Sequence, residues 1–368
     1  MADAATPFRT IFDREPDVTS AAPGRVNLIG EHTDYNDGFM LPIAVPMHTR
    51  VSAARRSDQQ VRAWSRDVPG ADQLMAFGIG MERRRAAWVD YLQGLTRSLL
   101  DAGHAITGFD VTVESDVPLG SGLSSSASLE VAVLRAIDAL FGLRLDGRTI
   151  AALAHRAETA FVGVPVGVMD QMACSLATED AALFIDARSL DFARVPLPAS
   201  VELLVLDSGL THAHAGGEYR LRRRECEAAA QSLGVASLRD ADARLLMARP
   251  LPSPLDRRAR HVVTENERVL EMRMALVADN MPAAGALMNA SHRSMSEDFE
   301  VSTPDIDVLA ALAQNQEGVT GARLTGGGFG GCVVALCARG YARSIGPAIV
   351  DRYSARTGRS GRVLVPGP

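Results

Sequence analysis

The sequence predicts a two-domain protein that combines α-helices with β-strands. A chain of 368 residues is long for one hydrophobic core, so two domains are the default expectation. Apolar residues recur at helical spacing in some segments and at every second position in others. A hydrophobic content of 47% with 22% charged residues is ordinary for a folded soluble protein.

The first half of the chain is expected to contain both strands and helices. Residues 22–51 predict two strands around a polar loop that turns at 36–38. Alternating apolar residues at 109–113 predict a further strand ahead of a Gly/Ser loop. A long helical stretch is expected over 129–160, with a break at 142–147.

The second half begins with short strands and continues with charged helices. Two or three strands are expected around 183–205, and the domain boundary is placed there. Residues 218–233 and 259–277 are rich in Arg and Glu at helical spacing, which indicates exposed faces with ion pairs rather than a binding surface. A glycine-rich turn that starts near residue 325 then leads into a strand, VVALCA.

Charge and composition favour small-molecule ligands over nucleic acid or a membrane surface. The net charge of −6 and the pI of about 5.8 provide no attraction to nucleic acid or anionic lipid. The first residues lack the apolar core of a signal peptide, and no window is long and apolar enough for a membrane helix, so the cytoplasm is the expected compartment. Four scattered cysteines without CxxC spacing are expected to be buried free thiols, namely Cys174, Cys226, Cys332 and Cys337.

The chain contains no lysine, so all 38 of its Lys and Arg residues are arginines. This absence excludes a Walker A loop, the phosphate-binding lysine of protein kinases and Schiff-base chemistry. If the protein handles phosphate, its charge must be neutralised by Arg, by backbone N–H groups and by a metal ion.

The segment PLGSGLSSSASLEVAV, residues 118–133, is the most informative stretch. Apolar residues recur at helical spacing from Leu129 to Leu140, which places the small residues at the N-terminus of a helix. Free backbone N–H groups and the helix dipole make that end an anion site, and small side chains let a phosphate approach the backbone. The alternative is that the small residues form only a flexible loop.

The segment TGGGFGG, residues 325–331, contains the pattern G-x-G-x-x-G at Gly326, Gly328 and Gly331. The pattern would indicate a dinucleotide enzyme if it followed a strand and opened a helix. Here it precedes the β-branched run CVVALC near the C-terminus, with no acidic residue at the required distance. A tight turn that packs against a ligand-binding loop fits better.

The segment GRVNLIGEHTDYNDG, residues 24–38, concentrates charged and polar side chains in one loop. Carboxylates with a histidine suit a polyhydroxyl ligand, because each sugar hydroxyl both donates and accepts hydrogen bonds. From composition alone, a solvated surface loop is the simpler alternative. A metal site formed by His32 with Glu31 and Asp34 is a third interpretation, but side chains at adjacent positions rarely point at one ion.

With these three segments, the chain resembles the GHMP small-molecule kinases, and within them the galactokinase family. GRVNLIGEHTDY is similar to that family's sugar-kinase signature, LGSGLSSSASLEVA to the nucleotide-phosphate motif and LTGGGFGGCVVAL to the third motif. VGVPVGVMDQMA, EYRLRRRECE and SHRSMSEDFEVS resemble intermediate segments, so the similarity extends from about residue 20 to the C-terminal strand. The resemblance implies MgATP-dependent phosphorylation of the anomeric hydroxyl of galactose, which gives galactose 1-phosphate and ADP.

The resemblance also implies roles for individual residues. Asp170 would be the catalytic carboxylate near the anomeric hydroxyl, and Arg25 would pair with it and steady developing charge. An Asp beside a guanidinium stays ionised, ready to orient the hydroxyl or accept its proton. Whether Asp170 is a true base stays open, since loose phosphoryl-transfer transition states need mostly positioning and charge neutralisation. Ser126 and Glu158 match the family's magnesium ligands, a hydroxyl and a carboxylate that suit a hard cation with several waters.

The remaining implied contacts divide between the sugar and the nucleotide. The sugar is expected to contact Glu31, His32, Thr33, Asp34, Gly167 and Tyr219. ATP is expected to contact Ser65, Gly120, Ser121, Gly122, Leu123, Ser124, Ser125 and Ser126. Met172 and Ala173 stand where family members often carry an aromatic residue, which bears on the shape of the pocket and not on the reaction. His212 and His214 are expected in a strand or loop at the mouth of the cleft.

The architecture implied by the resemblance is α+β in two lobes. Residues 1–182 are expected to form an N-terminal lobe with a mixed sheet, residues 183–368 a C-terminal lobe with antiparallel strands and helices, and the site is expected in the cleft between them. The expected partners are galactose, ATP and Mg²⁺, without nucleic acid or membrane, and the chain is expected to be a monomer. Three alternatives stay open: a related kinase for another sugar, mevalonate or homoserine, a non-catalytic sugar sensor, and a dinucleotide oxidoreductase.

Overall fold

The computed structural model describes residues 5–68, 70–210 and 215–367, and the chain divides into two compact units. Unit 1 contains Met1–Arg25, Val45–Pro118 and Ser124–Leu176, whereas unit 2 contains Val26–Ala44, Leu119–Leu123 and Ala177–Pro368. The sequence predicts two contiguous domains, whereas two segments from the first half of the chain, 26–44 and 119–123, belong to unit 2. This interleaving arises because the two segments contact the C-terminal half of the chain, as in the hydrogen bond from Asn27 N to Thr325 Oγ1.

Unit 1 contains a mixed five-stranded sheet. Its strands, in spatial order, are β1 (Val18–Asn27), β3 (Pro42–Arg55), β6 (Phe109–Ser115), β4 (Gln60–Ser65) and β5 (Leu74–Gly78). Strand β6 runs antiparallel to β3 and parallel to β4, and β4 and β5 form an antiparallel pair. The strand predicted at 109–113 is confirmed, and its apolar side chains are buried in the core of the unit.

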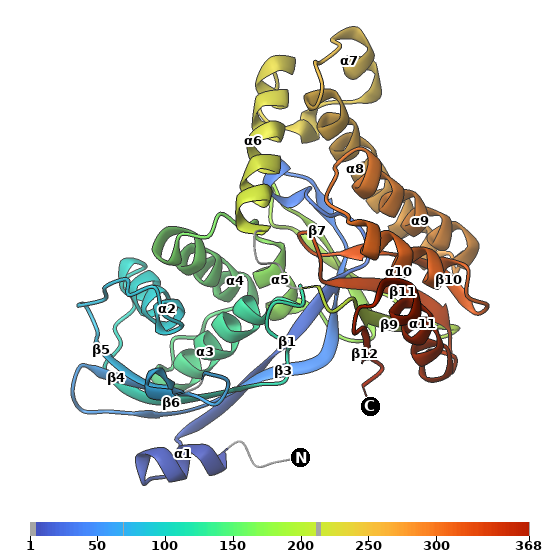
Figure 1. Ribbon diagram of the computed structural model, residues 1–368. Helices are drawn as coiled ribbons and strands as arrows, with labels where there is room; N and C mark the ends of the chain where they lie inside the picture. Colours follow the sequence, from blue (N-terminus) through green and yellow to red (C-terminus); the bar gives the residue numbers. More distant parts are fainter. Residues whose placement is uncertain (1–4, 69, 211–214, 368) are drawn as a thin grey trace. The chain divides into compact units, whose positions relative to one another are not determined.

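Four helices cover one face of this sheet, and α1 (Ala5–Phe12) lies on the other (Figure 1). The four are α2 (Val89–Asp101), α3 (Ser125–Phe141), α4 (Gly147–Arg156) and α5 (Met169–Leu176). Gly142 ends α3 in the left-handed conformation, and the Asp146 side chain caps α4 by accepting a hydrogen bond from Thr149 N. The helical stretch expected over 129–160, with its break at 142–147, is therefore confirmed.

Unit 2 contains two antiparallel sheets. The larger has the order β10 (Val319–Thr325), β11 (Cys332–Ala338), β9 (Val201–Asp207) and β12 (Arg362–Val365). The smaller has the order β2 (Phe39–Met40), β7 (Ala181–Asp186) and β8 (Phe192–Pro196). The short strands expected around 183–205 and the strand after the glycine-rich turn are confirmed.

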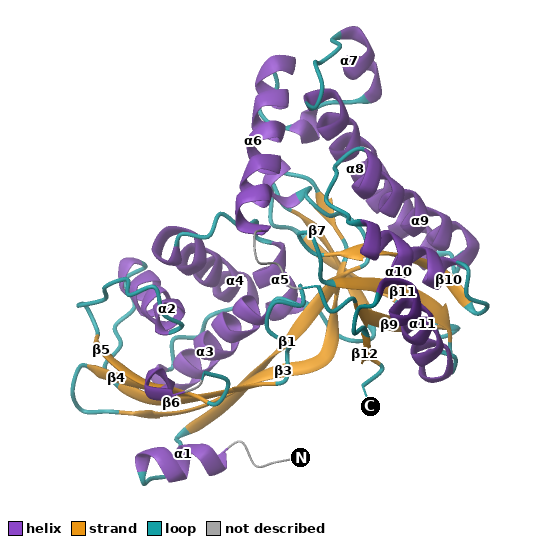
Figure 2. Ribbon diagram, in the orientation of Figure 1, coloured by secondary structure: helices purple, strands orange, loops and turns teal. Residues whose placement is uncertain are grey.

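The helices of unit 2 pack around the larger sheet and around one another (Figure 2). They are α6 (Ala215–Leu233), α7 (Ala243–Ala248), α8 (Leu255–Val277), α9 (Met281–Glu297), α10 (Pro304–Gln314) and α11 (Ala342–Thr357). Helix α8 contacts α6 and α9, and α9 packs on β10. Single 3-10 turns occur at Asp34–Asn36, Gly70–Gln73 and Leu238–Asp240. The core of this unit is formed by apolar side chains of β9, β10 and β11 together with α6, α8, α10 and α11.

Helix α8 has exposed ion pairs of the kind expected, such as Arg260 with Asp256, but it also carries buried polar residues that the spacing does not predict. Arg258, His261 and Glu265 on this helix are each at most 2% exposed. Most of their partners lie on other elements of unit 2, such as Ser291 on α9, which donates to Glu265 Oε1 at 2.6 Å. The sequence spacing of Glu and Arg is the same whether the partner lies on the same helix or on another one, so the pattern alone cannot distinguish the two cases.

Two further expectations can be compared with the described residues. The four cysteines are buried free thiols, as predicted. Among residues 5–68, 70–210 and 215–367, no helix has the length and apolar character needed to cross a membrane. His212 and His214 lie outside the described residues.

Candidate active site

Arg25 and Asp170 form an ion pair within unit 1. Arg25 lies near the end of β1, and Asp170 lies in the first turn of α5. Arg25 Nε and Nη2 lie 2.8 and 2.5 Å from the same carboxylate oxygen, Asp170 Oδ1. The Arg25 side chain is buried, whereas the Asp170 side chain is 25% exposed. The guanidinium therefore holds a carboxylate that a ligand can still reach.

Glu158 lies on a π-helical turn, Ala157–Val162, that continues directly from α4. The Glu158 carbonyl accepts a hydrogen bond from Gly163 N at 2.9 Å, which is the i→i+5 bond of this turn. Gly163 ends the turn with a φ of 83°, a conformation that favours glycine. Turns of this kind are rare and often occur at functional sites. Here the turn carries a carboxylate that is only 4% exposed.

Ser126 and Glu158 are neighbours in unit 1, as their assignment as magnesium ligands requires. The Ser126 hydroxyl and the Gln171 amide both hydrogen-bond to the Glu158 carboxylate, the amide at 2.6 Å. Burial and the nearby Asp170 carboxylate raise the pKa of Glu158 to about 7. A cation would relieve this repulsion, and a hydroxyl with a carboxylate is a donor set that fits Mg²⁺ with several waters. Among the residues that the structure describes, no group of three His, Cys, Asp or Glu side chains could replace this arrangement.

Two side chains behind Glu158 were not predicted from the sequence. Gln171 Nε2 also lies 3.3 Å from Glu130 Oε2, so this one amide donates to two carboxylates. Glu130 is fully buried on α3, and burial together with the charge of Glu158 raises the pKa of Glu130 well above its ordinary value. The sequence does contain a signal for Glu130, because this acidic residue stands inside the apolar run LEVAV. An acid at a buried position is rare unless it has a polar partner, so the run predicts a buried carboxylate with such a partner.

The Gly/Ser segment leads into the N-terminus of a helix, as predicted. Helix α3 begins at Ser125, and Ser124 precedes it in the left-handed conformation without a hydrogen bond from its side chain to the helix. The backbone amides of the first turn are therefore suited to an anion. Ser65, the other expected ATP contact, is buried at the end of β4, where its hydroxyl accepts a hydrogen bond from Asp67 N at 3.4 Å. Nucleotide binding at these positions stays a prediction.

The EHTDY loop (Gly30–Phe39) belongs to unit 2, where Glu31 joins it to the glycine-rich turn. Glu31 Oε1 accepts a hydrogen bond from Gly326 N at 2.8 Å. Glu31 Oε2 accepts hydrogen bonds from Asn27 Nδ2 at 2.6 Å and from Arg323 Nη1 at 2.8 Å. Burial raises the pKa of Glu31, and Arg323 and the Gly326 amide oppose that shift. Both carboxylate oxygens are thus already bound within unit 2, and the expected contact of Glu31 with the sugar stays a prediction.

His32 lies in a cluster of rings in unit 2. The centroid of its ring is 4.6 Å from that of Phe299, 5.4 Å from that of Tyr219 and 5.9 Å from that of Tyr35. His32 Nδ1 lies 2.9 Å from the Tyr35 hydroxyl. Burial, with the neighbouring His261, lowers the pKa of His32 to about 3, so the ring is neutral at physiological pH. Two expected sugar contacts, His32 and Tyr219, therefore lie side by side.

The other expected sugar contacts have different surroundings. Thr33 is buried, and its hydroxyl lies within 2.8 Å of two backbone carbonyl oxygens of the EHTDY loop. Asp34 is half-buried, and its Oδ1 accepts a hydrogen bond from Tyr35 N at 2.9 Å. Gly167 lies in unit 1, in the loop that precedes α5. Thr33 thus closes the loop, whereas Asp34 is the more accessible polar group.

The glycine-rich turn connects β10 and β11, which are antiparallel neighbours. This context confirms that the G-x-G-x-x-G pattern is not a dinucleotide fingerprint, which would open a helix. Gly326 has a φ of 87°, and a Cβ atom there would lie 3.3 Å from the Gly122 carbonyl oxygen. Cys332 Sγ donates to the Ser121 carbonyl oxygen at 3.1 Å. The turn therefore packs against the EHTDY loop and against residues 119–123, as predicted.

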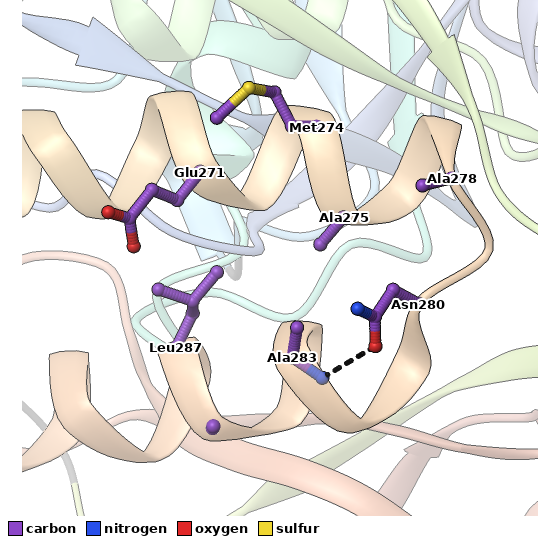
Figure 3. A pocket seen from close by; sticks show the side chains of 8 residues that line it. Glu271, Met274, Ala275, Ala278, Asn280, Ala283 and Leu287 are labelled. Atoms are coloured by element: carbon purple, nitrogen blue, oxygen red, sulfur yellow. Dashed lines mark hydrogen bonds between the residues drawn. The ribbon is translucent and has the colours of Figure 1, made fainter.

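A surface groove of about 450 Å³ lies between α8 and α9 (Figure 3). Its lining consists of Glu271, Met274, Ala275, Ala278, Asn280, Ala283, Ala286 and Leu287. Asn280 Oδ1 accepts a hydrogen bond from Ala283 N at 3.2 Å and so caps α9. The groove is too poor in polar groups for a sugar, and it shares no residue with the expected site.

Comparison with known proteins identifies the family. Residues 6–55 match the model described as galactokinase galactose-binding signature. Residues 90–178 match the GHMP kinases N terminal domain, and residues 272–354 match the GHMP kinases C terminal model.

Full-length relatives agree with these matches. The chain is 44% identical to galactokinases of Roseiflexus sp. (strain RS-1) and Chloroflexus aurantiacus, in each case over 97% of this chain and 93% of the relative. A crystal structure of Lactococcus lactis galactokinase complexed with galactose matches with a TM-score of 0.93 and 32% identity, over 98% of this chain and 96% of that chain. A mevalonate kinase structure, with a TM-score of 0.67 and 16% identity over 95% of this chain and 98% of that chain, shares the fold alone. This chain, an enzyme with the α+β fold of the GHMP kinases, belongs to the galactokinase family.

Proposed function

We propose that this chain transfers the γ-phosphoryl group of MgATP to the anomeric hydroxyl of galactose, which gives galactose 1-phosphate and ADP. The observation that carries the proposal is the Arg25–Asp170 pair beside Ser126 and Glu158 in a chain of the galactokinase family. An oriented carboxylate and a hard-cation donor set are what phosphoryl transfer to a hydroxyl requires.

In this proposal, Asp170 orients the anomeric hydroxyl and receives its proton. The hydroxyl oxygen forms a bond to the γ-phosphorus while the bond from that phosphorus to the β–γ bridging oxygen breaks, and ADP leaves. Arg25 holds the carboxylate in place through its two hydrogen bonds to Oδ1. Because the transition state is loose, positioning by this pair contributes to the rate even if proton transfer is late.

Ser126 and Glu158 would hold Mg²⁺, and the amides at the start of α3 would receive phosphate oxygens of the nucleotide. When bound, Mg²⁺ neutralises charge on the transferring phosphates. The chain has no lysine to share this task, so Arg side chains and backbone amides supply the rest. Gly120–Ser126 and Ser65 stay the expected nucleotide contacts.

Recognition of the sugar is assigned to the EHTDY loop and Tyr219 in unit 2. His32 is neutral and can donate or accept a hydrogen bond, and Asp34 accepts from hydroxyl groups. Gly167, ahead of Asp170, is the expected contact from unit 1. We also propose that the enzyme acts as a monomer in the cytoplasm.

The test is ADP release by the purified chain with MgATP and a panel of galactose, glucose, N-acetylgalactosamine, mevalonate and homoserine. Glucose is the C4 epimer, so it would leave a polar group of the loop unpaired, which costs about 1–3 kcal/mol and more for a charged group. A site that is built to hydrogen-bond the hydroxyl groups of one sugar can favour that sugar over a mismatched one by a factor of roughly 10⁴ or more. We therefore expect galactose to be strongly preferred, the acetamido sugar to react poorly and both non-sugars to be inert.

The alternatives give different results in this assay. Equal use of galactose and glucose would contradict the proposed specificity. Sugar binding without ADP release would favour a sensor, although the presence of Ser126, Glu158 and Asp170 speaks against lost catalysis. Phosphorylation of mevalonate would assign the chain to another GHMP kinase activity.

A further inference from the structure

Three polar side chains of α8 hydrogen-bond the backbone of the EHTDY loop. His261 Nε2 lies 3.1 Å from the Glu31 carbonyl oxygen. Glu265 Oε1 accepts from Gly30 N at 2.9 Å, and Asn266 Oδ1 accepts from Phe39 N at 2.8 Å. Because the three positions are spaced i, i+4 and i+5, they lie on one face of the helix. This face, defined as the α8 platform, holds both ends of the loop.

The loop lies directly on the platform, with no room for added atoms. Gly30 has a φ of 100°, and a Cβ atom there would lie 2.9 Å from a methyl group of Val269 on α8. A Cβ atom at Gly38 would collide with Asn266 Oδ1. Glycine at these two positions is therefore a requirement of the contact between the loop and the helix.

The platform also supports the ring of His32. The centroids of His261 and Phe299 are 4.5 Å apart, and those of Phe299 and His32 are 4.6 Å apart. Phe299 is thus packed between the two histidines. A shift of His261 would move the ring on which His32 rests.

Further contacts within unit 2 hold the platform in one arrangement. The Glu31 carbonyl can only accept, so His261 donates from Nε2, and its Nδ1 lies 2.9 Å from the Ser294 hydroxyl. Arg268 Nε lies 2.6 Å from Glu265 Oε2, and Ser291 donates to Glu265 Oε1 at 2.6 Å. A side chain whose own partners are satisfied cannot turn away from the loop without leaving polar groups unpaired.

We propose that His261, Glu265 and Asn266 are positioning residues that set the affinity for galactose by fixing the backbone of the EHTDY loop. The inference rests on the proposed assignment of this loop to sugar binding. It identifies a determinant of the sugar site on a helix about 230 residues further along the chain, which acts through its contacts with the loop backbone.

The first experiment compares His261→Phe with His261→Gln. Phenylalanine keeps a ring against Phe299 but removes the hydrogen bond to Glu31, whereas glutamine restores an N–H donor without the ring. We expect His261→Phe to weaken galactose binding, measured by calorimetry without nucleotide, and to raise KM for galactose about 10-fold. We expect KM for ATP to change less than twofold, and His261→Gln to recover part of the galactose affinity.

Val262→Ala is the matched control, because Val262 is a fully buried neighbour on α8 that packs in the apolar core. It should lower stability without changing the affinity for galactose. If His261→Phe raises both KM values together, or if Val262→Ala has the same effect, the platform has no specific role in sugar binding and the inference is overturned. If His261→Phe does not fold, Asn266→Ala replaces it, and unchanged galactose affinity in that variant would overturn the inference.

His32→Ala separates this inference from the proposed function. If His32→Ala leaves galactose affinity unchanged, the assignment of the loop to the sugar is wrong and the platform inference falls with it. If His32→Ala weakens galactose binding while His261→Phe and Asn266→Ala do not, the loop assignment holds and the platform inference alone is overturned.

Discussion

Replacement of Asp170 with Asn removes the charge of the carboxylate while keeping its shape. Arg25 donates two hydrogen bonds to Oδ1 of this side chain, from Nε and Nη2. An asparagine oxygen at the same place can accept both hydrogen bonds, so the guanidinium should stay in position. The variant therefore removes the proton acceptor and the charge of the pair with little change in geometry.

The expected magnitude follows from this geometry. A positioned acid–base group contributes about 10²–10⁴-fold to the rate. We therefore expect kcat of Asp170→Asn to fall at least about 100-fold, which corresponds to about 2.7 kcal/mol of transition-state stabilisation. The acceptor loses its charge while the buried guanidinium keeps its own, and the weakening of these two hydrogen bonds should lower the free energy of unfolding by about 1–3 kcal/mol.

The assay is ADP release at saturating galactose and MgATP, with urea unfolding of the same preparation. Asp110→Asn is the control, because Asp110 is a buried carboxylate of unit 1 that pairs with Arg14, Arg56 and Arg62. It should lose stability but keep kcat. A folded Asp170→Asn variant with kcat within threefold of the original chain would refute the role assigned to Asp170.

Two further predictions concern the metal site and pH. Ser126→Ala and Glu158→Gln should raise the Mg²⁺ concentration needed for half-maximal rate, and weaken Mn²⁺ binding followed by electron paramagnetic resonance, more than they raise KM for galactose. Unchanged metal dependence would mean that the ligands are wrong. Burial lowers the pKa of His261 from 6.5 to about 4. Between pH 6.5 and pH 4 the histidine is therefore protonated in the unfolded chain but not in the folded one, so the free energy of unfolding decreases as the pH falls. In urea titrations from pH 4 to 7, His261→Gln should reduce the slope of unfolding free energy against pH by up to about 1.4 kcal/mol per unit, and an unchanged slope would contradict a buried neutral His261.

The features that sequence predicts well in this chain are local ones. Helix α3 and its glycine-containing start follow from the periodicity that begins at Leu129 and from the chemistry of small residues at a helix N-terminus. The break before α4 follows from Gly142 in the left-handed conformation and from Asp146 as a cap. The pairing of Arg25 with Asp170 joins positions 145 residues apart, so it could be expected only through the family resemblance.

The polar residues that sequence analysis missed are those whose partners lie far away in the chain. Gln171 follows Asp170 directly, yet nothing local indicates that its amide bridges Glu130 and Glu158. Arg323 precedes the glycine-rich turn, but its pairing with Glu31 depends on the packing of β10 against the EHTDY loop. The sequence predicts exposed ion-paired faces over 259–277 and does not indicate the α8 platform. An Arg/Glu-rich helix has the same pattern whether its polar face is exposed or covers a loop.

The residues of the EHTDY loop differ in how far their polar atoms are already bound within unit 2. Glu31 already binds three donors, and a sugar hydroxyl would have to replace one of them, with a buried unpaired group costing about 1–3 kcal/mol. Thr33 is likewise committed to backbone carbonyls of the loop. His32 Nε2 has no hydrogen-bond partner at bonding distance among the described residues, and Asp34 is half-buried. Within the proposed function, we therefore expect His32 and Asp34 to contribute most to discrimination between sugars, and Glu31, Thr33 and the α8 platform to hold the loop that carries them.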